Sequence, residues 1–455
     1  MNRVASALAE KWADGARIPL RAPRNADETG CPPDLLTDLC ARFLARQGRL
    51  RLRDLAGLVK LPPSVLADIL GGMRNRRLVE VAGHSGFEAD TEYQLTEHGQ
   101  IHAREAYARC QYTGPAPVSL EAYRERVDSH SLRHQTVSAH DVRAAFSGLT
   151  VAPEVVDQLG AAMNSGRATL IYGPAGSGKT FLAEHLAALQ PGHIPVPYAI
   201  TVGGEIIQVF DPLIHTPLPP PMEGDSMLVR TDRDERWLFC QRPVVLTGGE
   251  LTLQMLDLQF DPATRFYQAP PHMKANGGVF VVDDLGRQLV APRDLMNRWI
   301  VPLDRSVDYL SLHTGFKFAV PFDMTIIFST NLCPQAIADE AFLRRFGYKV
   351  YLGPLEPAAY QQVFEAVCRA QGVSFDPAGF AWLIEQRHQA EGRPLLACYP
   401  RDLVGRVRDF ALYEGRAACA SIEALARAWM SYFTTAGMSG GTESFQSSRI
   451  GGGAA

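Results

Sequence analysis

One short segment limits what this chain can fold into more than any other part of its sequence. Residues 173–180 read GPAGSGKT and match G-x-x-x-x-G-K-S/T, with a strand-like run at 169–172 before them and a helical run at 181–189 after them. Glycine in such a turn permits positive φ angles and a close approach of the backbone to a ligand. Backbone N–H groups at a helix N-terminus, together with the helix dipole, favour negative charge. The segment therefore predicts a loop that surrounds phosphate groups.

Two side chains of this loop have predicted roles of their own. Lys179 is expected to reach the β and γ phosphates of ATP, and the Thr180 hydroxyl is expected to ligate Mg²⁺. ATP and Mg²⁺ are therefore the ligands that the sequence predicts. The residues expected to contact the nucleotide are Gly173, Pro174, Ala175, Gly176, Ser177, Gly178, Lys179, Thr180 and Phe181.

An acidic pair follows an apolar run that is typical of a buried parallel strand, residues 279–282. Alone, such a pair is usually a cap at the end of a strand. Beside a phosphate-binding loop, Asp283 is expected to hold the Mg²⁺ shell. Asp284 stands where a base would orient the attacking water, with a shorter side chain than the Glu often found there.

A second buried run, residues 324–328, ends in Ser329, Thr330 and Asn331. Ligands collect at the carboxyl ends of strands in open α/β sheets, so Asn331 is expected to position the attacking water. In isolation the simpler interpretation is an Asn that caps a turn.

The order of motifs along about residues 151–435 resembles that of the AAA+ ATPases. The motifs are, in chain order, the loop, the Asp pair, the polar strand end, the R-R-F of residues 344–346 and the P-R-D of residues 400–402. The resemblance is specific because five motifs recur in sequence. It implies an α/β P-loop AAA+ domain, with a parallel sheet flanked by helices, followed by an α-helical lid.

The same resemblance implies roles for four further residues. Asn331 is expected to be sensor 1, Arg345 or its neighbour Arg344 the arginine finger, and Arg401 sensor 2. An arginine finger reaches the γ-phosphate of a neighbouring subunit, so the resemblance implies self-association into a ring, usually a hexamer.

A β-hairpin pattern narrows the resemblance further. Residues 309–312 and 316–320 alternate around His313, Thr314 and Gly315, which looks like the pre-sensor-1 hairpin of MoxR-like ATPases, branch-migration motors and enhancer-binding activators. The whole chain most closely resembles a bacterial group of predicted ATPases with chaperone activity, associated with Flp pilus assembly. The segments that carry this match are QAPPHMKANGGVFVVDDLGRQ, LMNRWIVPLDRSVDYL and FSTNLCPQAIADEAFLRRF.

Residues 33–112 have the element order of a winged helix, which is similar to the DNA-binding domains of bacterial transcription regulators. Residues 41–80 carry nine Arg or Lys and three Asp or Glu, a surplus that favours nucleic-acid binding. The would-be recognition helix at 63–76 has no cation before Arg74, which favours protein docking or a structural role instead.

The remaining pattern divides the chain into segments. About 100 residues separate Lys179 from Asp283, which implies an insertion with strand pairs that turn at residues 203–204 and 248–249. The predicted division is a loosely ordered arm at 1–32, a winged-helix domain at 33–112, a linker with some helix at 113–150, an AAA+ α/β domain at 151–354 with an insertion at about 195–275, a helical lid at 355–436 and a disordered tail at 437–455.

Composition excludes some classes of protein. The chain has 46% hydrophobic and 21% charged residues and a formal charge of −4. This charge argues against a histone-like protein, whose whole surface neutralises the phosphates of nucleic acid. The eight cysteines include no C-x-x-C pair, so neither zinc nor a disulfide framework is predicted. No apolar stretch approaches the length of a membrane span. A cytoplasmic protein without membrane insertion is expected.

These features together predict an ATP hydrolase that forms a ring and remodels or assembles a protein client. Two alternatives remain open at this stage. The winged helix is compatible with a nucleic-acid motor or transcription activator, and the short Asp284 is compatible with an ATP-dependent switch that does not hydrolyse its ligand.

Overall fold

The structure is a computed structural model that describes residues 20–83, 88–187, 190, 192–219 and 233–433. It divides into two compact units, one ending at Leu352 and the other beginning at Gly353. The predicted tail at 437–455 and the first 19 residues of the predicted arm lie outside the described residues.

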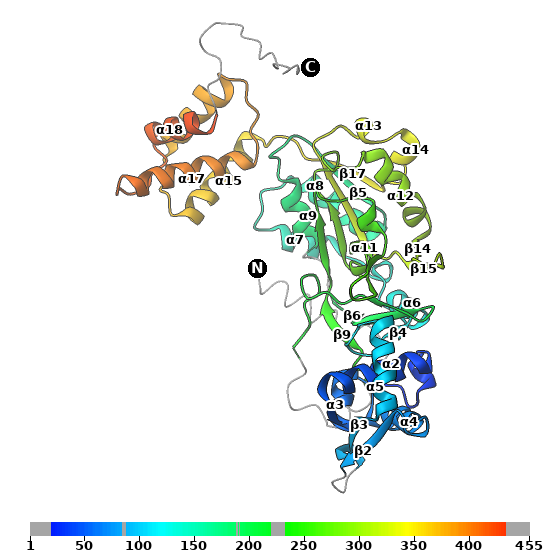
Figure 1. The fold of residues 1–455 in the computed structure, drawn as a ribbon. Coiled ribbons are helices and arrows are strands. Elements are labelled where there is room, and N and C mark those ends of the chain that lie inside the picture. The colour runs from blue at the N-terminus through cyan, green and yellow to red at the C-terminus, as the bar shows by residue number, and fades with distance from the viewer. Residues whose placement is uncertain (1–19, 84–87, 188–189, 191, 220–232, 434–455) are drawn as a thin grey trace, which may run out of the picture. The chain divides into compact units, whose positions relative to one another are not determined.

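Five parallel strands form the central sheet of the first unit: β5 (Thr169–Tyr172), β10 (Val244–Thr247), β13 (Val279–Val282), β16 (Thr325–Thr330) and β17 (Tyr348–Tyr351). Their order in space is β10-β13-β16-β5-β17, so the carboxyl ends of all five meet at one edge. With helices on both faces (Figure 1), this is the α/β P-loop AAA+ fold that the sequence predicts.

Side-chain alternation divides the core between the two faces of the sheet. Val279 and Val281 pack with α7, α8 and α9, whereas Phe280 and Val282 pack on the other face with α12. Trp299 of α12 is fully buried, with its ring centroid 5.6 Å from that of Phe280. The covering helices are α7 (Ala139–Phe146), α8 (Pro153–Ser165) and α9 (Lys179–Ala187) on one face, and α12 (Pro292–Arg305), α13 (Pro334–Ile337) and α14 (Glu340–Leu343) on the other.

The predicted insertion at about 195–275 needs a correction, because β10 falls within it and yet belongs to the central sheet. The predicted strand pair at residues 203–204 is present as β7 and β8, but the pair predicted at residues 248–249 is wrong. The glycines there end β10, whose partner is the distant, parallel β13. The strands outside the central sheet are β6 (His193–Pro197), which pairs with β9 (Trp237–Gln241), and the mixed sheet of β11 (Gln259–Asp261), β12 (Phe266–Gln268), β8 (Glu205–Gln208), β7 (Ala199–Val202) and β4 (Val118–Ser119).

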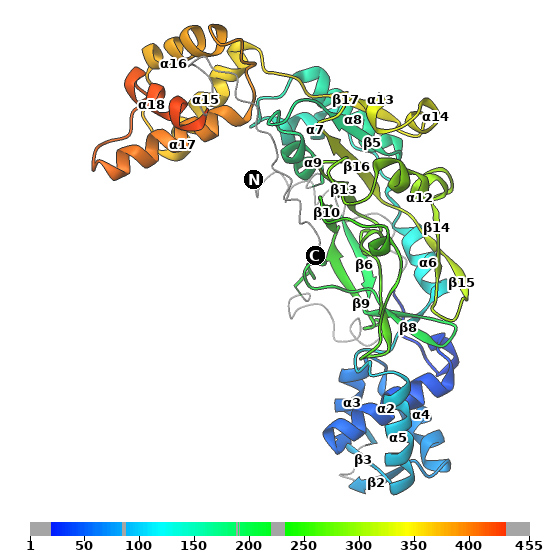
Figure 2. The same ribbon diagram turned by 45° about the horizontal axis from the view of Figure 1, so that its top comes forward.

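The predicted hairpin consists of β14 (Val307–Ser311) and β15 (Lys317–Pro321), which pair antiparallel. Figure 2 shows α6 (Leu120–Ser129) beside it, and Arg124 of α6 donates to the carbonyl of Ala319 at 2.6 Å.

The elements predicted for residues 33–112 are present in the predicted order, with one added strand. In that order they are α2 (Pro33–Gln47), β1 (Arg49–Arg51), α3 (Leu52–Val59), α4 (Pro63–Asn75), β2 (Val79–Gly83), β3 (Glu92–Leu95) and α5 (Glu97–Arg109). Their core also includes Ala199 of β7 and Ile206 of β8, so these elements pack directly on the mixed sheet.

The predicted arm needs a correction for its residues 20–32, because they are packed rather than loose. Leu20 is buried, and a short turn of helix, η1 (Asp27–Thr29), ends beneath a buried arginine. Arg236 donates hydrogen bonds to the carbonyls of Thr29 and Pro117 and forms an ion pair with Asp234. A buried guanidinium requires acceptors, and these backbone carbonyls supply them.

The predicted linker at 113–150 also needs a correction. Besides α6 and α7 it contains a turn, η3 (Leu132–His134), and Val118, Leu120, Val142 and Phe146 are all buried in the core of the first unit. This stretch is part of the α/β domain because its helices carry apolar faces that the sheets bury.

In the described part of the second unit, residues 353–433, four helical segments pack together, as predicted for the lid. Tyr360, Phe364, Leu403, Leu425 and Trp429 are all buried in its core. The segments are α15 (Pro357–Gln371), α16 (Pro377–Leu383) with a π-helical continuation η5 (Ile384–Gln389), α17 (Cys398–Tyr413) and α18 (Ile422–Tyr432).

Within the described residues, no single helix is both long and apolar enough to cross a membrane, although α3 and α4 pass that test as a pair bent by 109°.

A buried carboxylate fixes the root of the β14–β15 hairpin. Asp308 accepts hydrogen bonds from His272 Nε2 at 2.9 Å and from both terminal nitrogens of Arg298 at 2.7 and 2.9 Å. His272 lies in α11 (Pro271–Lys274) and Arg298 in α12. Burial acts to raise the pKa of Asp308, but the hydrogen bonds from His272 and Arg298 outweigh it and hold that pKa below its ordinary value.

Replacing Asp308 tests this anchor. Asp308→Asn leaves Arg298 without its buried counter-charge, and we expect the free energy of unfolding to fall by about 3 kcal/mol in urea titrations at pH 7 followed by tryptophan fluorescence. Asp257→Asn removes a 3.5 Å ion pair to the same arginine from a carboxylate that is 66% exposed, and should change it by less than about 1 kcal/mol. Because the pKa of Asp308 is lowered, its contribution is complete at neutral pH and disappears as the pH falls through that lowered value. Equal losses in the two variants would contradict the anchor.

Candidate nucleotide site

The predicted phosphate loop connects β5 to α9, which begins at Lys179. Gly173, Gly176 and Gly178 have φ angles of 150°, 83° and 96°, a region that favours glycine. A Cβ at position 173 would also overlap the carbonyl of Leu352. The glycine pattern is therefore a requirement of the backbone path and not only of a ligand.

Lys179 points back into this loop. Its Nζ donates to the carbonyls of Gly173 at 3.1 Å and Pro174 at 2.9 Å, and to Asn331 Oδ1 at 2.7 Å. The residue is only 5% exposed, and this burial lowers the pKa of Lys179 against the opposing effect of Asp284 and Asp283. The ammonium group is thus held at the carboxyl edge of the sheet by neutral acceptors that a phosphate can replace.

The two predicted metal ligands are in contact. Thr180 Oγ1 donates to Asp283 Oδ2 at 2.8 Å and Oδ1 at 3.0 Å, and Ser329 donates to Asp283 Oδ1 as well. Gln288 Nε2 donates to the backbone carbonyl of Asp283 at 2.9 Å. Asp283 therefore lies where β13, β16 and α9 meet, with its carboxylate oriented by two hydroxyl groups.

Asn331 connects the lysine to the second acidic residue. Its Oδ1 accepts from Lys179, and its Nδ2 donates to Asp284 Oδ1 at 2.9 Å. Asp284 has a φ angle of 48°, which is uncommon outside glycine and is tolerated best by Asp and Asn. The strained turn after β13 aims this carboxylate along the edge of the sheet toward Asn331.

The donor set fits a nucleotide with Mg²⁺. The hydroxyl of Ser177 is buried and has no hydrogen-bond partner among the described residues, inside a loop that is built to receive acceptor oxygens. No three His, Cys, Asp or Glu side chains gather in the described part of the chain. A metal held by Thr180 and Asp283 would therefore take further ligands from the phosphate oxygens of the nucleotide, which is how Mg²⁺ is commonly bound. Phe181 is 53% exposed next to the loop.

The two predicted finger residues lie elsewhere. Arg344 and Arg345 precede β17, at the amino edge of the sheet and opposite the phosphate loop. Arg345 is held by Asp304 through hydrogen bonds of 3.0 Å from Nε and Nη2. Arg344 is 76% exposed, and its ion pair with Glu340 is also exposed and therefore weak.

Arg401 lies in the first turn of α17, in the second unit, and its side chain is 76% exposed. Its predicted contact with the nucleotide stays a prediction.

Sequence reasoning missed Ser329 and Gln288 as partners of Asp283. Ser329 could have been found, because it lies two residues before Asn331 at the polar end of the same buried strand. Gln288 carries no such signal, since it reaches Asp283 from a loop.

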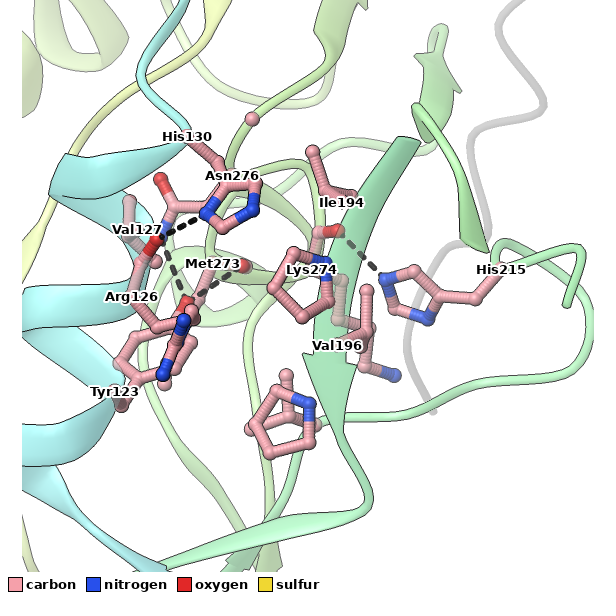
Figure 3. A pocket seen from close by; sticks show the side chains of 14 residues that line it. Tyr123, Arg126, Val127, His130, Ile194, Val196, His215, Met273, Lys274 and Asn276 are labelled. Atoms are coloured by element: carbon pink, nitrogen blue, oxygen red, sulfur yellow. Dashed lines mark hydrogen bonds between the residues drawn. The ribbon is translucent and has the colours of Figure 1, made fainter. Parts of the chain in front are cut away.

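A further hollow, next to α6, is too small for a ligand. It encloses about 20 Å³, room for a single water. Figure 3 shows Tyr123, Met273 and Asn276 joined there by hydrogen bonds, and Asn276 Nδ2 donates to Tyr123 at 2.9 Å. Asn276 therefore has a structural role at the entry to β13.

In comparisons with known protein families, residues 356–431 of the second unit match a domain of unknown function (DUF8689). No curated protein matches the sequence. Among solved structures, NtrX from Brucella abortus in complex with ADP is 16% identical with a TM-score of 0.38, and the match covers 72% of this chain and 65% of that chain. The chain thus spans just under two thirds of the length of that protein.

Two other structures are similar at the same low level. The Holliday junction branch migration motor RuvB of Thermotoga maritima is 14% identical, with 66% of this chain and 72% of that chain covered and a TM-score of 0.34. The FIGL-1 AAA domain is 12% identical, with 58% and 70% covered and a TM-score of 0.31.

Gly173→Ala tests the geometry of the loop. The added Cβ meets the Leu352 carbonyl at a positive φ angle, so we expect the free energy of unfolding to fall by about 1–3 kcal/mol. Urea titrations measure the loss. Gly315→Ala, at the hairpin tip, has a positive φ angle but open space around the added atom, and should cost less. A harmless Gly173→Ala would contradict the described path.

Proposed function

We propose that this chain is an Mg²⁺-dependent ATP hydrolase of the AAA+ kind, which assembles into a ring and uses hydrolysis to remodel a protein client. The observation that carries the proposal is the junction of Lys179, Thr180, Asp283, Asp284 and Asn331 at the carboxyl edge of one parallel sheet. Three separate segments of the chain meet there and bring together a buried cation, Lys179, and the carboxylates of Asp283 and Asp284.

Each residue has a role that its contacts support. Lys179 exchanges the Gly173 and Pro174 carbonyls for phosphate oxygens, which its charge attracts more strongly. Thr180 and Asp283 would hold Mg²⁺, which neutralises charge that develops on the phosphates. Asp284 accepts a proton from the attacking water or orients it, and Asn331 fixes the position of that carboxylate. Positioning and charge supply most of the rate in such reactions.

A second candidate is an ATP-dependent switch without turnover. The hydrogen bond from Asn331 Nδ2 to Asp284 favours it, because an aspartate that is already engaged and has a short side chain reaches less far toward a water. Release of inorganic phosphate by the purified protein separates the two candidates.

The ring and the client rest on sequence resemblance, which relates the chain to MoxR-like ATPases and to a group associated with Flp pilus assembly. The opposite placement of Lys179 and Arg345 on the two edges of the sheet supports a ring, since a head-to-tail contact brings the two edges of different copies together. The β14–β15 hairpin, with Tyr309 and Phe316 more than half exposed, offers an apolar contact surface for an unfolded segment of a client.

Nucleic acid is a weaker candidate because most cations of the N-terminal elements already have partners. Of the nine Arg and Lys at 41–80, Arg42 is buried against backbone carbonyls, and Arg51, Arg53, Lys60 and Arg76 form ion pairs. Arg49 and Arg46 bond to neutral side chains. The surplus that the sequence shows is therefore largely satisfied within the chain.

Variants of the phosphate loop and the acidic pair test the activity. Lys179→Ala removes a charged donor and should weaken ATP binding by about 10- to 100-fold, measured with a fluorescent ATP analogue. Asp284→Asn should keep binding and lower kcat by about 10²- to 10⁴-fold in a phosphate-release assay. Asp294→Asn, exposed in α12, serves as the control and should behave as the parent. Unchanged turnover in both site variants would overturn the proposal.

Gel shifts of the full chain test the nucleic-acid alternative. We expect no complex with a duplex of about 30 base pairs at about 150 mM salt, where counterion release gives little affinity to a surface whose cations are paired. A complex that weakens steeply with salt, and that Arg74→Ala with Arg77→Ala abolishes, would favour the nucleic-acid function instead.

A further inference from the structure

A hollow of about 390 Å³ lies at the amino edge of the central sheet. Segments that lead into β5 and β16 line it, together with the end of α12 and the Arg344–Arg345 pair. The lining is mainly polar and includes four arginines and two aspartates: Arg133, Arg167, Arg344, Arg345, Asp304 and Asp323. Its formal charge is therefore positive.

Arg167 differs from the other three arginines. Arg345 is paired with Asp304, Arg344 with Glu340, and Arg133 bonds to Ser306 and lies 3.7 Å from Asp323. Arg167 is exposed, and its guanidinium has no hydrogen bond or ion pair within the described part of the chain. It is the cation of the hollow that is ready to accept an anion.

The fold holds Arg167 next to the predicted finger. Gly347 donates from its backbone to the Ala168 carbonyl at 2.9 Å, which continues the register of β17 with β5. A Cβ at position 347 would lie 2.7 Å from Cβ and 3.2 Å from Cδ of Arg167. The glycine that follows Phe346 thus gives the stem of Arg167 its room beside Arg345.

The hollow cannot serve the nucleotide of its own chain. Lys179 follows the carboxyl end of β5, whereas Arg167 precedes its amino end, and the four residues of the strand alone span about 13 Å. The apolar core of the sheet fills the space between them. An anion in the hollow therefore comes from another molecule, and a copy of this chain that stacks edge to edge presents one.

We propose that Arg167 acts in trans: in the assembly, it contacts the phosphates of ATP bound to the neighbouring copy, beside Arg344 and Arg345, and stabilises the charge that develops during hydrolysis. This inference rests on the proposed function and adds a residue that no motif marks. The chemistry it fits is a triphosphate, because a planar guanidinium binds phosphate oxygens through two parallel hydrogen bonds.

Arg167→Ala is the primary test in the full-length protein. We expect ATP binding to stay within about twofold of the parent, because the loop around Lys179 is untouched, and kcat for phosphate release to fall by about 100-fold. Arg167→Lys should recover part of the rate. Arg143→Ala, which removes an exposed arginine paired with Asp157 outside the hollow, is the matched control and should leave the rate unchanged.

Mixing variants shows on which copy the arginine acts. Arg167→Ala has an intact loop and Lys179→Ala an intact Arg167, so about a quarter of the junctions in a 1:1 mixture join the two functional halves. Activity should return on mixing. A parent-like Arg167→Ala, or an inactive one that mixing does not rescue, overturns the trans role. A change in the turnover of the parent with added sulfate that Arg167→Ala abolishes, without rescue on mixing, would mean a local anion site instead.

The two proposals fail in distinguishable ways. If the parent chain releases no phosphate, the hydrolase proposal is wrong, and Arg167 is then tested by ATP-dependent assembly in analytical ultracentrifugation. Assembly of Arg167→Ala equal to that of the parent would overturn the contact with a neighbour's nucleotide as well.

Discussion

The ammonium group of Lys179 is the charge around which the first unit is organised. Buried and 5% exposed, it needs acceptors, and it takes two from its own loop and one from Asn331. These bonds require a tight loop with glycine at Gly173, and they require the strand that ends in Asn331 to lie next to β5. The sheet order supplies that neighbour, since β16 separates β5 from β13 and so brings Asp283 and Asp284 to the same corner. The contacts that stabilise the folded loop are thus the same ones that form the candidate nucleotide site.

Sequence patterns correctly predicted the elements whose conformation depends on neighbouring residues. They failed for segments whose structure depends on contacts with distant parts of the chain. The loop at 173–180, the strand before Asp283 and the β14–β15 hairpin follow from glycine spacing and alternation, and the structure contains them. The predictions of a loose arm, for its residues 20–32, and of a linker were wrong because these stretches gain order from partners far away in the sequence, such as Arg236. A Gly-Gly pair at 248–249 predicted a hairpin, but only the folded sheet shows that β10 pairs with β13. Arg167 belongs to no sequence pattern. Its place in the hollow is seen only in the folded structure, where it lies next to Gly347.

The N-terminal elements are less independent than a domain on a flexible tether would be. Their core shares Ala199 and Ile206 with the mixed sheet, and the backbone of Gln111 donates to Thr264 between β11 and β12 at 2.8 Å. Arg265 in the same turn donates to the Ala108 carbonyl. Displacing these elements therefore exposes apolar surface and unpairs backbone groups, so they act as a fixed extension of the α/β domain.

Helix α12 carries two ion pairs that face different parts of the molecule. Arg298 in its middle binds Asp308 at the root of the hairpin, and Asp304 near its end binds Arg345 at the amino edge. A helix is stiff over such a distance, so the two ion pairs fix the position of α12 at two points. While both ion pairs hold, any displacement of Arg345 is transmitted through α12 to the root of the hairpin. The position of Arg345 and the orientation of the hairpin are therefore mechanically linked through a single helix.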